Sequence, residues 1–301
     1  MNKLGLIIKN EYLTDIRGKS FWIATFILPV VVLLFGCFGG FMMEGSDTFM
    51  DLNASLQPSP DPGQLTGLKI IGMLMGIFLV LFLMTYGSQI FNKVKVEKCN
   101  RIMEVLATCV TGRTMMLAKI IAVGLVGMTQ LMLWGILVAV IAVGILIVFP
   151  IGIPWQMLFD GDVVMAFVWS LLFFIGGYVF YGSLFAAVGA MTDKNNENQE
   201  YIAVLTFILL GSFYIGEFAV DNGTSTFAIV CSYIPFTSPV TGCVNAIVQT
   251  VPVWQSLLSL LVLYGFALLS LAFSGKVYTS SLLLKGKRFS PRDIITFLKS
   301  K

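Results

Sequence analysis

Few side chains in this sequence are suited to catalytic or metal chemistry. Histidine is absent from all 301 residues, which excludes His-ligated metal sites and His general bases, and with them Ser–His, Cys–His and zinc-hydrolase mechanisms. No two of the five cysteines form a CxxC pair; they are Cys37, Cys99, Cys109, Cys231 and Cys243. A disulfide between Cys231 and Cys243 and ordinary apolar packing of both are open alternatives. The sequence therefore predicts no catalytic, cofactor-binding or metal-ligating residue.

Polar groups inside the apolar runs are also few. A membrane-embedded protease or lipid-modifying transferase would need acids, His or Cys clustered at membrane depth, and FDGD at residues 159–162 has no partner acid in another span. Glu217 lies at the outer end of the fifth apolar run and is the one acid worth testing as part of a substrate path. With Gln130 and Asn245 it forms the candidate substrate path, because polar groups inside spans mark such paths. Hydrogen bonds between helices explain the two amides equally well.

Charged residues are concentrated in EKCNRIMEVLATCVTGR, residues 97–113. Helical spacing gives this segment one apolar face and one polar face; their members are Ile102, Val105, Leu106, Cys109 and Val110 on the first, and Glu97, Arg101, Glu104 and Thr108 on the second. A solvated interfacial helix would favour Lys and Arg throughout its polar face. Acids and bases alternate here, which suits directional pairing with a protein. Glu97, Arg101 and Glu104 are therefore candidate docking residues.

The elements that position these residues are apolar helices. Hydrophobic residues make up 57% of the chain and charged residues 12%, against about 25% charged in soluble domains. Uncharged runs of about 20 residues can cross a bilayer as helices, and six are expected: Phe21–Met43, Ile70–Phe91, Ile120–Phe149, Val163–Met191, Tyr201–Gly216 (extending at most to Val220) and Val253–Gly275. The fold class is an all-α polytopic membrane protein.

Charge between the runs is sorted by sign. All but one of the 19 Lys and Arg residues fall in the two termini and in the second and fourth connections, and the exception is Lys69. The other side carries mostly acids: Glu44, Asp47, Asp51, Asp61, Asp160, Asp162 and Asp221. Because basic loops stay in the cytoplasm, both termini are expected there.

The uncharged stretch between Asn222 and Gly275 is long enough for two spans, but IPFTSP at residues 234–239 breaks its first half. An extra span would also place the basic C-terminal tail outside. We therefore expect residues 226–249 to form two short helices that enter the membrane from its outer side and return. Non-helical backbone at that depth must be satisfied by protein or water.

Four segments resemble the ABC-2 type permeases, in particular the NatB-like sodium-efflux group. They are KNEYLTDIRGKSFWIATFILPVV before the first span, VEKCNRIMEVLATCVTGRTMMLAKIIAVGLVGMTQLMLW around the segment 97–113, GAMTDKNNENQE before the fifth span, and SYIPFTSP after it. The segments follow the family's order and are spread over nearly the whole chain. One departure is the connection Glu44–Lys69, which is short where NatB-like permeases usually hold a large outer domain.

The resemblance implies a single permease domain over residues 1–301, with six spans and the fold of the type V ABC exporters. It implies an N-terminal connecting helix over residues 1–20, a coupling helix over 97–113 with Arg101 and Glu104 on its exposed stripe, and an outer re-entrant hairpin over 222–252. It also implies two partners besides the lipid bilayer: an ABC ATP-binding subunit, and a second copy of this chain or a related permease. No nucleic-acid partner is expected.

The sequence holds no GxxxxGK[ST] phosphate-binding loop, so ATP is expected on the separate ATPase and this chain is not expected to be an enzyme. The predicted function is the permease subunit of an exporter in the inner (cytoplasmic) membrane. The scarcity of charge within the spans favours an amphipathic, lipid-like or peptide substrate over sodium. The alternative is an ATP-independent channel or secondary transporter, which inverted repeats would mark; no convincing internal repeat is present.

Overall fold

The computed structural model describes residues 3–19, 21–23, 25, 62–99, 111–148, 161–192 and 200–283, and the regular secondary structure of this part of the chain is entirely α-helical. Five helices are long and apolar enough to cross a membrane. Their full bounds are α4 Pro62–Cys99, α6 Gly112–Val148, α8 Gly161–Met191, α9 Glu200–Asn222 and α12 Val253–Leu283. The all-helical class is confirmed, and these five helices coincide with five of the predicted spans. The first predicted span lies mostly outside the described residues, so the count of six stays a prediction.

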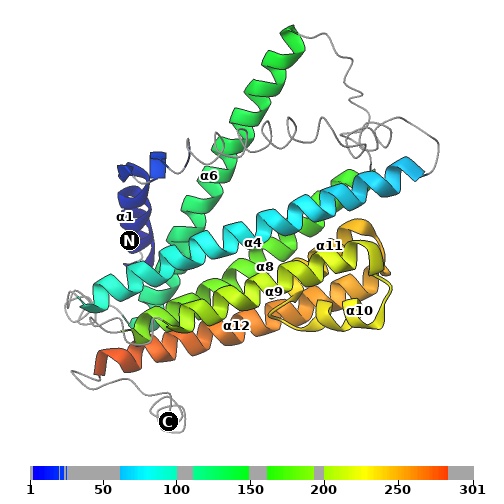
Figure 1. The fold of residues 1–301 in the computed structure, drawn as a ribbon. Helices are drawn as coiled ribbons and strands as arrows, with labels where there is room; N and C mark the ends of the chain where they lie inside the picture. Colours follow the sequence, from blue (N-terminus) through cyan, green and yellow to red (C-terminus); the bar gives the residue numbers. More distant parts are fainter. Residues whose placement is uncertain are drawn as a thin grey trace.

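Four of these helices, α4, α8, α9 and α12, run side by side in Figure 1. Aromatic side chains fill the junction where α4 meets α8. Phe82 lies with its ring centroid 4.0 Å from that of Tyr86 and 4.5 Å from that of Phe174. All three side chains are buried, and pairs of aromatic rings at such distances add to the stability that apolar burial provides.

The helix α6 is inclined to this bundle and leaves it toward the top of Figure 1. Its first half packs on the bundle, where Tyr178 of α8 donates a hydrogen bond to the Ile120 carbonyl at 2.7 Å. Its second half is exposed on one side, at Met132, Ile136 and Val140. The short helix α1, Lys3–Arg17, packs beside the first half of α6.

Two short helices, α10 (Thr226–Tyr233) and α11 (Ser238–Val248), lie between α9 and α12. Ser225 caps α10 by accepting a hydrogen bond from the Ala228 amide, as N-cap residues do. Every residue of α11 is buried, because α4, α8, α9, α10 and α12 all pack around it. Two short helices occupy the place where two were predicted. Whether they re-enter a membrane stays a prediction.

Glycine lets α8 approach α4 closely near the end where α4 stops. A Cβ at Gly189 would lie 2.7 Å from the carbonyl oxygen of Phe91, and a backbone atom cannot move aside as a side chain can. We expect Gly189→Ala to destabilise the protein by about 1–3 kcal/mol, the range for overpacking. Thermal unfolding in detergent would measure the loss.

The matched control is Gly265→Ala in α12, where the added Cβ would meet nothing within 4 Å. There alanine is expected to stabilise the helix by up to about 1 kcal/mol. Equal effects of the two substitutions would contradict the close approach of α4 and α8.

Candidate functional site

A network of charged and polar side chains joins four helices at the end of the bundle where α4 and α12 stop. Lys119 of α6 is its centre, with only 2% of its side chain exposed. Its ammonium donates to Glu11 of α1 at 2.8 Å and to the carboxylate of Glu97 in the last turn of α4. Lys93 of α4 donates to the other oxygen of Glu11 at 2.9 Å.

Two further side chains extend this network. Lys93 also donates to Asp15 of α1 at 2.5 Å, and the Tyr278 hydroxyl of α12 donates to Glu97 at 3.5 Å. The acids are about four-fifths buried, and buried charges are tolerated only when paired and hydrogen-bonded. We call these six residues the Lys119 network: Glu11, Asp15, Lys93, Glu97, Lys119 and Tyr278.

The ionisation of Glu11 depends on this network. Burial raises the pKa of its carboxyl, but the ammonium groups of Lys119 and Lys93 outweigh burial and hold the pKa below its ordinary value. A carboxyl with a depressed pKa stabilises the folded state above its unfolded pKa. That stability is lost as the pH falls through the lowered pKa, so the docking of α1 is expected to weaken only in acid.

The structure places Glu97 differently from the prediction. It was assigned to the polar stripe of a separate helix beginning at residue 97, but α4 continues through Cys99 and carries Glu97 in its last turn. The side chain is 16% exposed and bonded to Lys119, so it faces the bundle. Arg101 and Glu104 lie outside the described residues, as does the whole stretch 100–110.

The Lys119 network is not evident from the sequence, because its bonded members lie up to 181 residues apart, as Glu97 and Tyr278 do. The available signal was one lysine inside TMMLAKIIA, since an ammonium within an apolar run calls for acid partners. A second signal was the spacing of four between Glu11 and Asp15 and again between Lys93 and Glu97. Four residues apart on a helix places two side chains on one face.

The three candidates for a substrate path come from three different helices, and no hydrogen bond joins them among the described residues. Gln130 of α6 is buried and accepts a hydrogen bond from the Tyr86 hydroxyl at 2.6 Å. Asn245 of α11 is 1% exposed; its oxygen accepts from Thr250 at 3.3 Å, and its amide nitrogen has no partner among the described residues. Gln130 thus joins two helices, whereas Asn245 retains a free donor.

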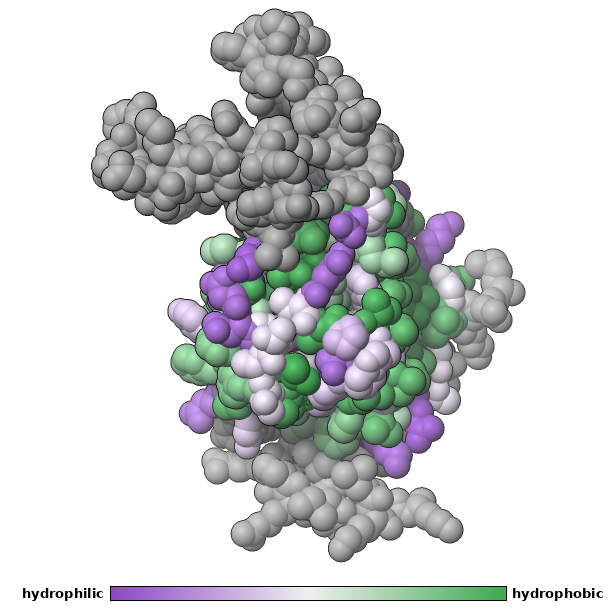
Figure 2. Space-filling view, turned by 90° about the vertical axis from the view of Figure 1, so that its right-hand side faces the viewer, coloured by the Kyte–Doolittle hydropathy of each residue, from purple (hydrophilic) through white to green (hydrophobic). Residues whose placement is uncertain are grey.

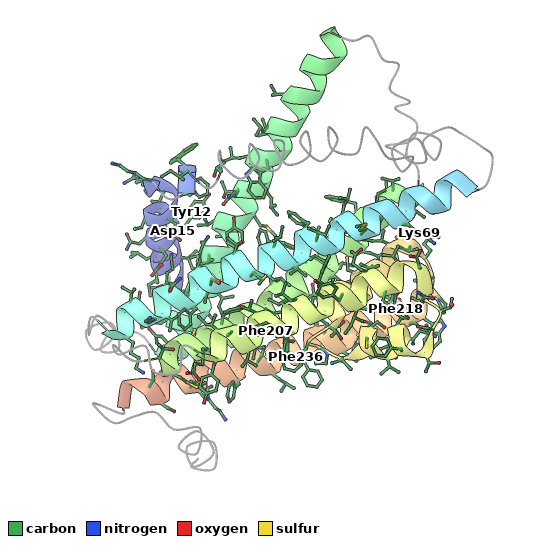
Figure 3. The ribbon with its side chains drawn as sticks, in the orientation of Figure 1. Tyr12, Asp15, Lys69, Phe207, Phe218 and Phe236 are labelled. Carbon is green, nitrogen blue, oxygen red and sulfur yellow. The ribbon has the colours of Figure 1, made fainter. Side chains whose placement is uncertain are left out.

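Glu217 lies in the last two turns of α9, facing α4. One of its carboxylate oxygens is buried without a hydrogen-bond partner in the described part of the chain, and it would lie 3.9 Å from a Cβ at Gly76. The nearby acid Asp221 is paired instead, with Lys69 of α4 at 2.9 Å. Figure 3 shows Lys69 at the end of α4 opposite to α1.

Cys231 and Cys243 are both buried and both free thiols. The alternative of apolar packing therefore describes them, and the disulfide does not form. Among the described residues no three His, Cys, Asp or Glu side chains are grouped so as to hold a metal ion.

Comparison with known proteins identifies the family of this chain. The profile described as "ABC-2 family transporter protein" matches residues 45–276. The uncharacterized protein YhaP of Bacillus subtilis is 27% identical over 237 residues, covering 74% of this chain and 53% of its own length. The uncharacterized protein MJ1024 of Methanocaldococcus jannaschii is 23% identical over 227 residues, with the same two coverages.

This chain therefore spans about half the length of these two curated relatives. No solved structure matches it. The family profile covers most of the sequence, including all of α4, α6, α8 and α9 and most of α12. The chain belongs to the ABC-2 family of transporter proteins.

Proposed function

We propose that this chain is the permease subunit of an ATP-binding-cassette exporter and is driven by a separate ATPase. The observation that carries the proposal is the Lys119 network at the base of the segment 97–113. Glu97, where this segment begins, is bonded to Lys119 of α6, which is bonded in turn to Glu11 of α1. Glu97 also accepts a hydrogen bond from Tyr278 of α12. A displacement of the segment would therefore be transmitted to α1, α6 and α12.

The mechanism follows from that connection. When the ATPases close on ATP, they push on the coupling segment, and Arg101 and Glu104 are the proposed contacts. Lys119 is almost fully buried, so its bonds are little screened by solvent. We propose that α1, α4, α6 and α12 then move as one unit, which changes access to a path on the other side of the bundle.

Orientation is part of the proposal. The described basic residues lie at the end of the bundle that holds the Lys119 network, except for Lys69 at the opposite end. This distribution supports a cytoplasmic location for the network and for the N-terminus. The membrane would be the inner (cytoplasmic) membrane of the cell.

One hydrogen bond supports a re-entrant course for α10 and α11. The Tyr181 hydroxyl of α8 donates to the carbonyl of Phe236, in the turn between the two short helices, at 2.5 Å. Tyr181 lies 20 residues after Gly161, where α8 begins, which corresponds to about 30 Å of helix at 1.5 Å per residue. The turn would thus reach beyond the middle of α8 from the outer side.

The outer end has the surface expected of a membrane-inserted protein. Figure 2 looks at this end, where pale residues gather near the middle and green, hydrophobic residues lie among and around them, with purple residues mostly at the margins. On α9, the aromatic side chains of Phe207 and Tyr214 are 73% and 72% exposed. Both lie on one face of α9 with Phe218, and Figure 3 shows Phe207 and Phe218 along this helix. We propose that a second permease packs on this aromatic face.

The substrate path is proposed to include Glu217. A buried carboxylate oxygen without a partner costs stability, so its presence is better explained by transport than by folding. A bound cation, or a hydrogen-bond donor on an amphipathic ligand, would supply the partner that this oxygen lacks. The proposal therefore keeps two substrate classes: sodium, and an amphipathic, lipid-like or peptide compound.

Replacing Glu217 by Gln tests this role. The variant keeps the shape of the side chain and removes its charge, so we expect it to be at least as stable as the wild type and to transport several-fold more slowly. Thermal unfolding and transport in proteoliposomes would be measured together. Asp221→Asn is the control, because it breaks an exposed pair worth about 0–1 kcal/mol and leaves Glu217 in place. Unchanged transport by Glu217→Gln would remove this residue from the path.

The function as a whole is tested by co-purification. The tagged chain would be expressed with the ATP-binding-cassette ATPase encoded nearest to its gene, and the complex assayed for ATP-driven transport. Retention of the ATPase by the folded permease, with ATP-dependent transport, is the expected result. Transport by the permease without any ATPase would instead establish the alternative function, an ATP-independent channel or secondary transporter.

A further inference from the structure

The helix α1 separates its charges onto two faces. Its acids, Glu11 and Asp15, point into the bundle and are both bonded within the Lys119 network. Tyr12 also faces inward, and its hydroxyl lies 2.8 Å from that of Thr129 in α6. Figure 3 shows Tyr12 and Asp15 on this helix. Both acidic side chains of α1 therefore lie on its inward face.

The opposite face and the short turn that follows it are basic. Lys9, Arg17 and Lys19 are exposed, and none of the three forms an ion pair within the described residues. The neighbouring exposed positions of α1 are uncharged and include Leu6, which is 53% exposed. In the sequence the two acids stand between Lys9 and Arg17, so the separation of charge onto two faces is not visible in the residue order.

Apolar side chains are exposed immediately after the basic turn. Trp22 is 46% exposed and Ile23 is 55% exposed, whereas Phe21 between them and Lys19 is buried. Tryptophan is enriched at the boundary between the lipid headgroups and the hydrocarbon of a bilayer. Figure 1 draws α1 across the direction of α4, α8, α9 and α12, as a helix lying along a membrane surface would be.

We propose that Lys9, Arg17 and Lys19 bind the phosphate groups of anionic phospholipids in the cytoplasmic leaflet. Anionic lipids attract basic segments next to a membrane surface, and a helix with Lys and Arg on its polar face is typical of such binding. The Lys119 network makes this possible, because it holds the two acids of α1 away from the lipid phosphates. The inference rests on the proposed orientation, with this end of the bundle in the cytoplasm.

The complementary charge alone would also suit an acidic protein surface. The exposed Trp22 and Ile23 beside the basic residues favour lipid. A surface that docks a protein in water would not require exposed apolar side chains at its edge, whereas a bilayer offers hydrocarbon to them. The proposal therefore commits to phospholipid, and docking of the ATPase on this face is an outcome of the test.

The test uses the purified full chain without any ATPase, so that its result is independent of the proposed transport function. The protein would be equilibrated with equal amounts of phosphatidylglycerol and phosphatidylcholine, and the bound lipids counted by native mass spectrometry. The wild type is expected to retain phosphatidylglycerol several-fold over phosphatidylcholine. The Lys9→Gln/Arg17→Gln/Lys19→Gln variant is expected to lose that preference.

Two matched variants make the result specific. Lys9→Arg/Arg17→Lys/Lys19→Arg keeps the charge and is expected to keep the preference, while Lys276→Gln removes an exposed charge of α12 and is expected to leave it unchanged. If the triple Gln variant does not fold, Arg17→Gln/Lys19→Gln is measured in its place and should lose most of the preference.

Three outcomes would overturn the proposal. The wild type could show no preference for phosphatidylglycerol, or the Gln variants could keep the full preference. In the third outcome, the Gln variants keep the lipid preference but no longer retain the ATPase in co-purification, and this face of α1 would then be a protein-docking surface. Failure of the wild type to bind any ATPase would count against the proposed function and not against lipid binding.

Discussion

Replacing Lys119 by Met is expected to destabilise the protein by about 3–5 kcal/mol, the cost of removing one partner from a buried ion pair. The methionine has nearly the length of the lysine, so the main change is the lost ammonium. Glu97 would keep only the Tyr278 hydroxyl, and Glu11 would keep only Lys93. Thermal unfolding in detergent and the yield of folded protein would measure the effect.

The double variant Lys119→Met/Glu97→Gln separates charge from packing. Removing the unpaired carboxylate as well should restore much of the lost stability, because coupled residues are not additive. The control is Lys69→Met, which breaks the pair with Asp221 at the other end of the bundle. The side chains of this pair are 35% exposed for Lys69 and 74% exposed for Asp221. Its loss should therefore cost at most about 1 kcal/mol. Equal losses in Lys119→Met and Lys69→Met would contradict the buried network.

Reversing Arg101 and Glu104 together, as Arg101→Glu/Glu104→Arg, is expected to abolish coupling to the ATPase without unfolding the permease. A close charge pair in a protein interface contributes about 1.5 kcal/mol or more, so the affinity for the ATPase should fall by more than about tenfold. ATP-driven transport should fall with it. Co-purification and transport in proteoliposomes would be compared with the wild type.

The thermal stability of this variant is the necessary control, because a folding defect would also reduce transport. A conservative pair, Arg101→Lys/Glu104→Asp, keeps both signs and should retain most of the ATPase. Normal transport by the reversed variant would show that Arg101 and Glu104 do not lie in the ATPase interface.

The membrane-spanning helices were predictable from the sequence because a bilayer leaves few alternatives to a helix. The predicted run Ile120–Phe149 and the observed α6 differ mainly at the first end, where α6 begins at Gly112. The fifth span was predicted too short, since Glu217 and Asp221 lower the apolar character of its last turns. In the structure α9 continues to Asn222.

The Lys119 network was not predictable in the same way. Lys93 and Lys119 were interpreted as loop charges that set the orientation, and Glu97 as part of an exposed stripe. Periodicity reports which face of its own helix a residue occupies. It does not report which distant helix packs on that face, and the network depends on α1 docking against α4 and α6. The ABC-2 resemblance, by contrast, was visible in local segments and is confirmed by the family comparison.

The complete burial of α11 has a consequence for experiments that map topology by chemical labelling. Cysteines placed at any position from Ser238 to Val248 would be shielded from a membrane-impermeant maleimide, as Cys243 already is. A scan of single cysteines would record an uninterrupted protected stretch followed by accessible residues near Gln249. That protection would report burial among the other helices and not a crossing of the bilayer, because α11 has 11 residues and a spanning helix needs about 20.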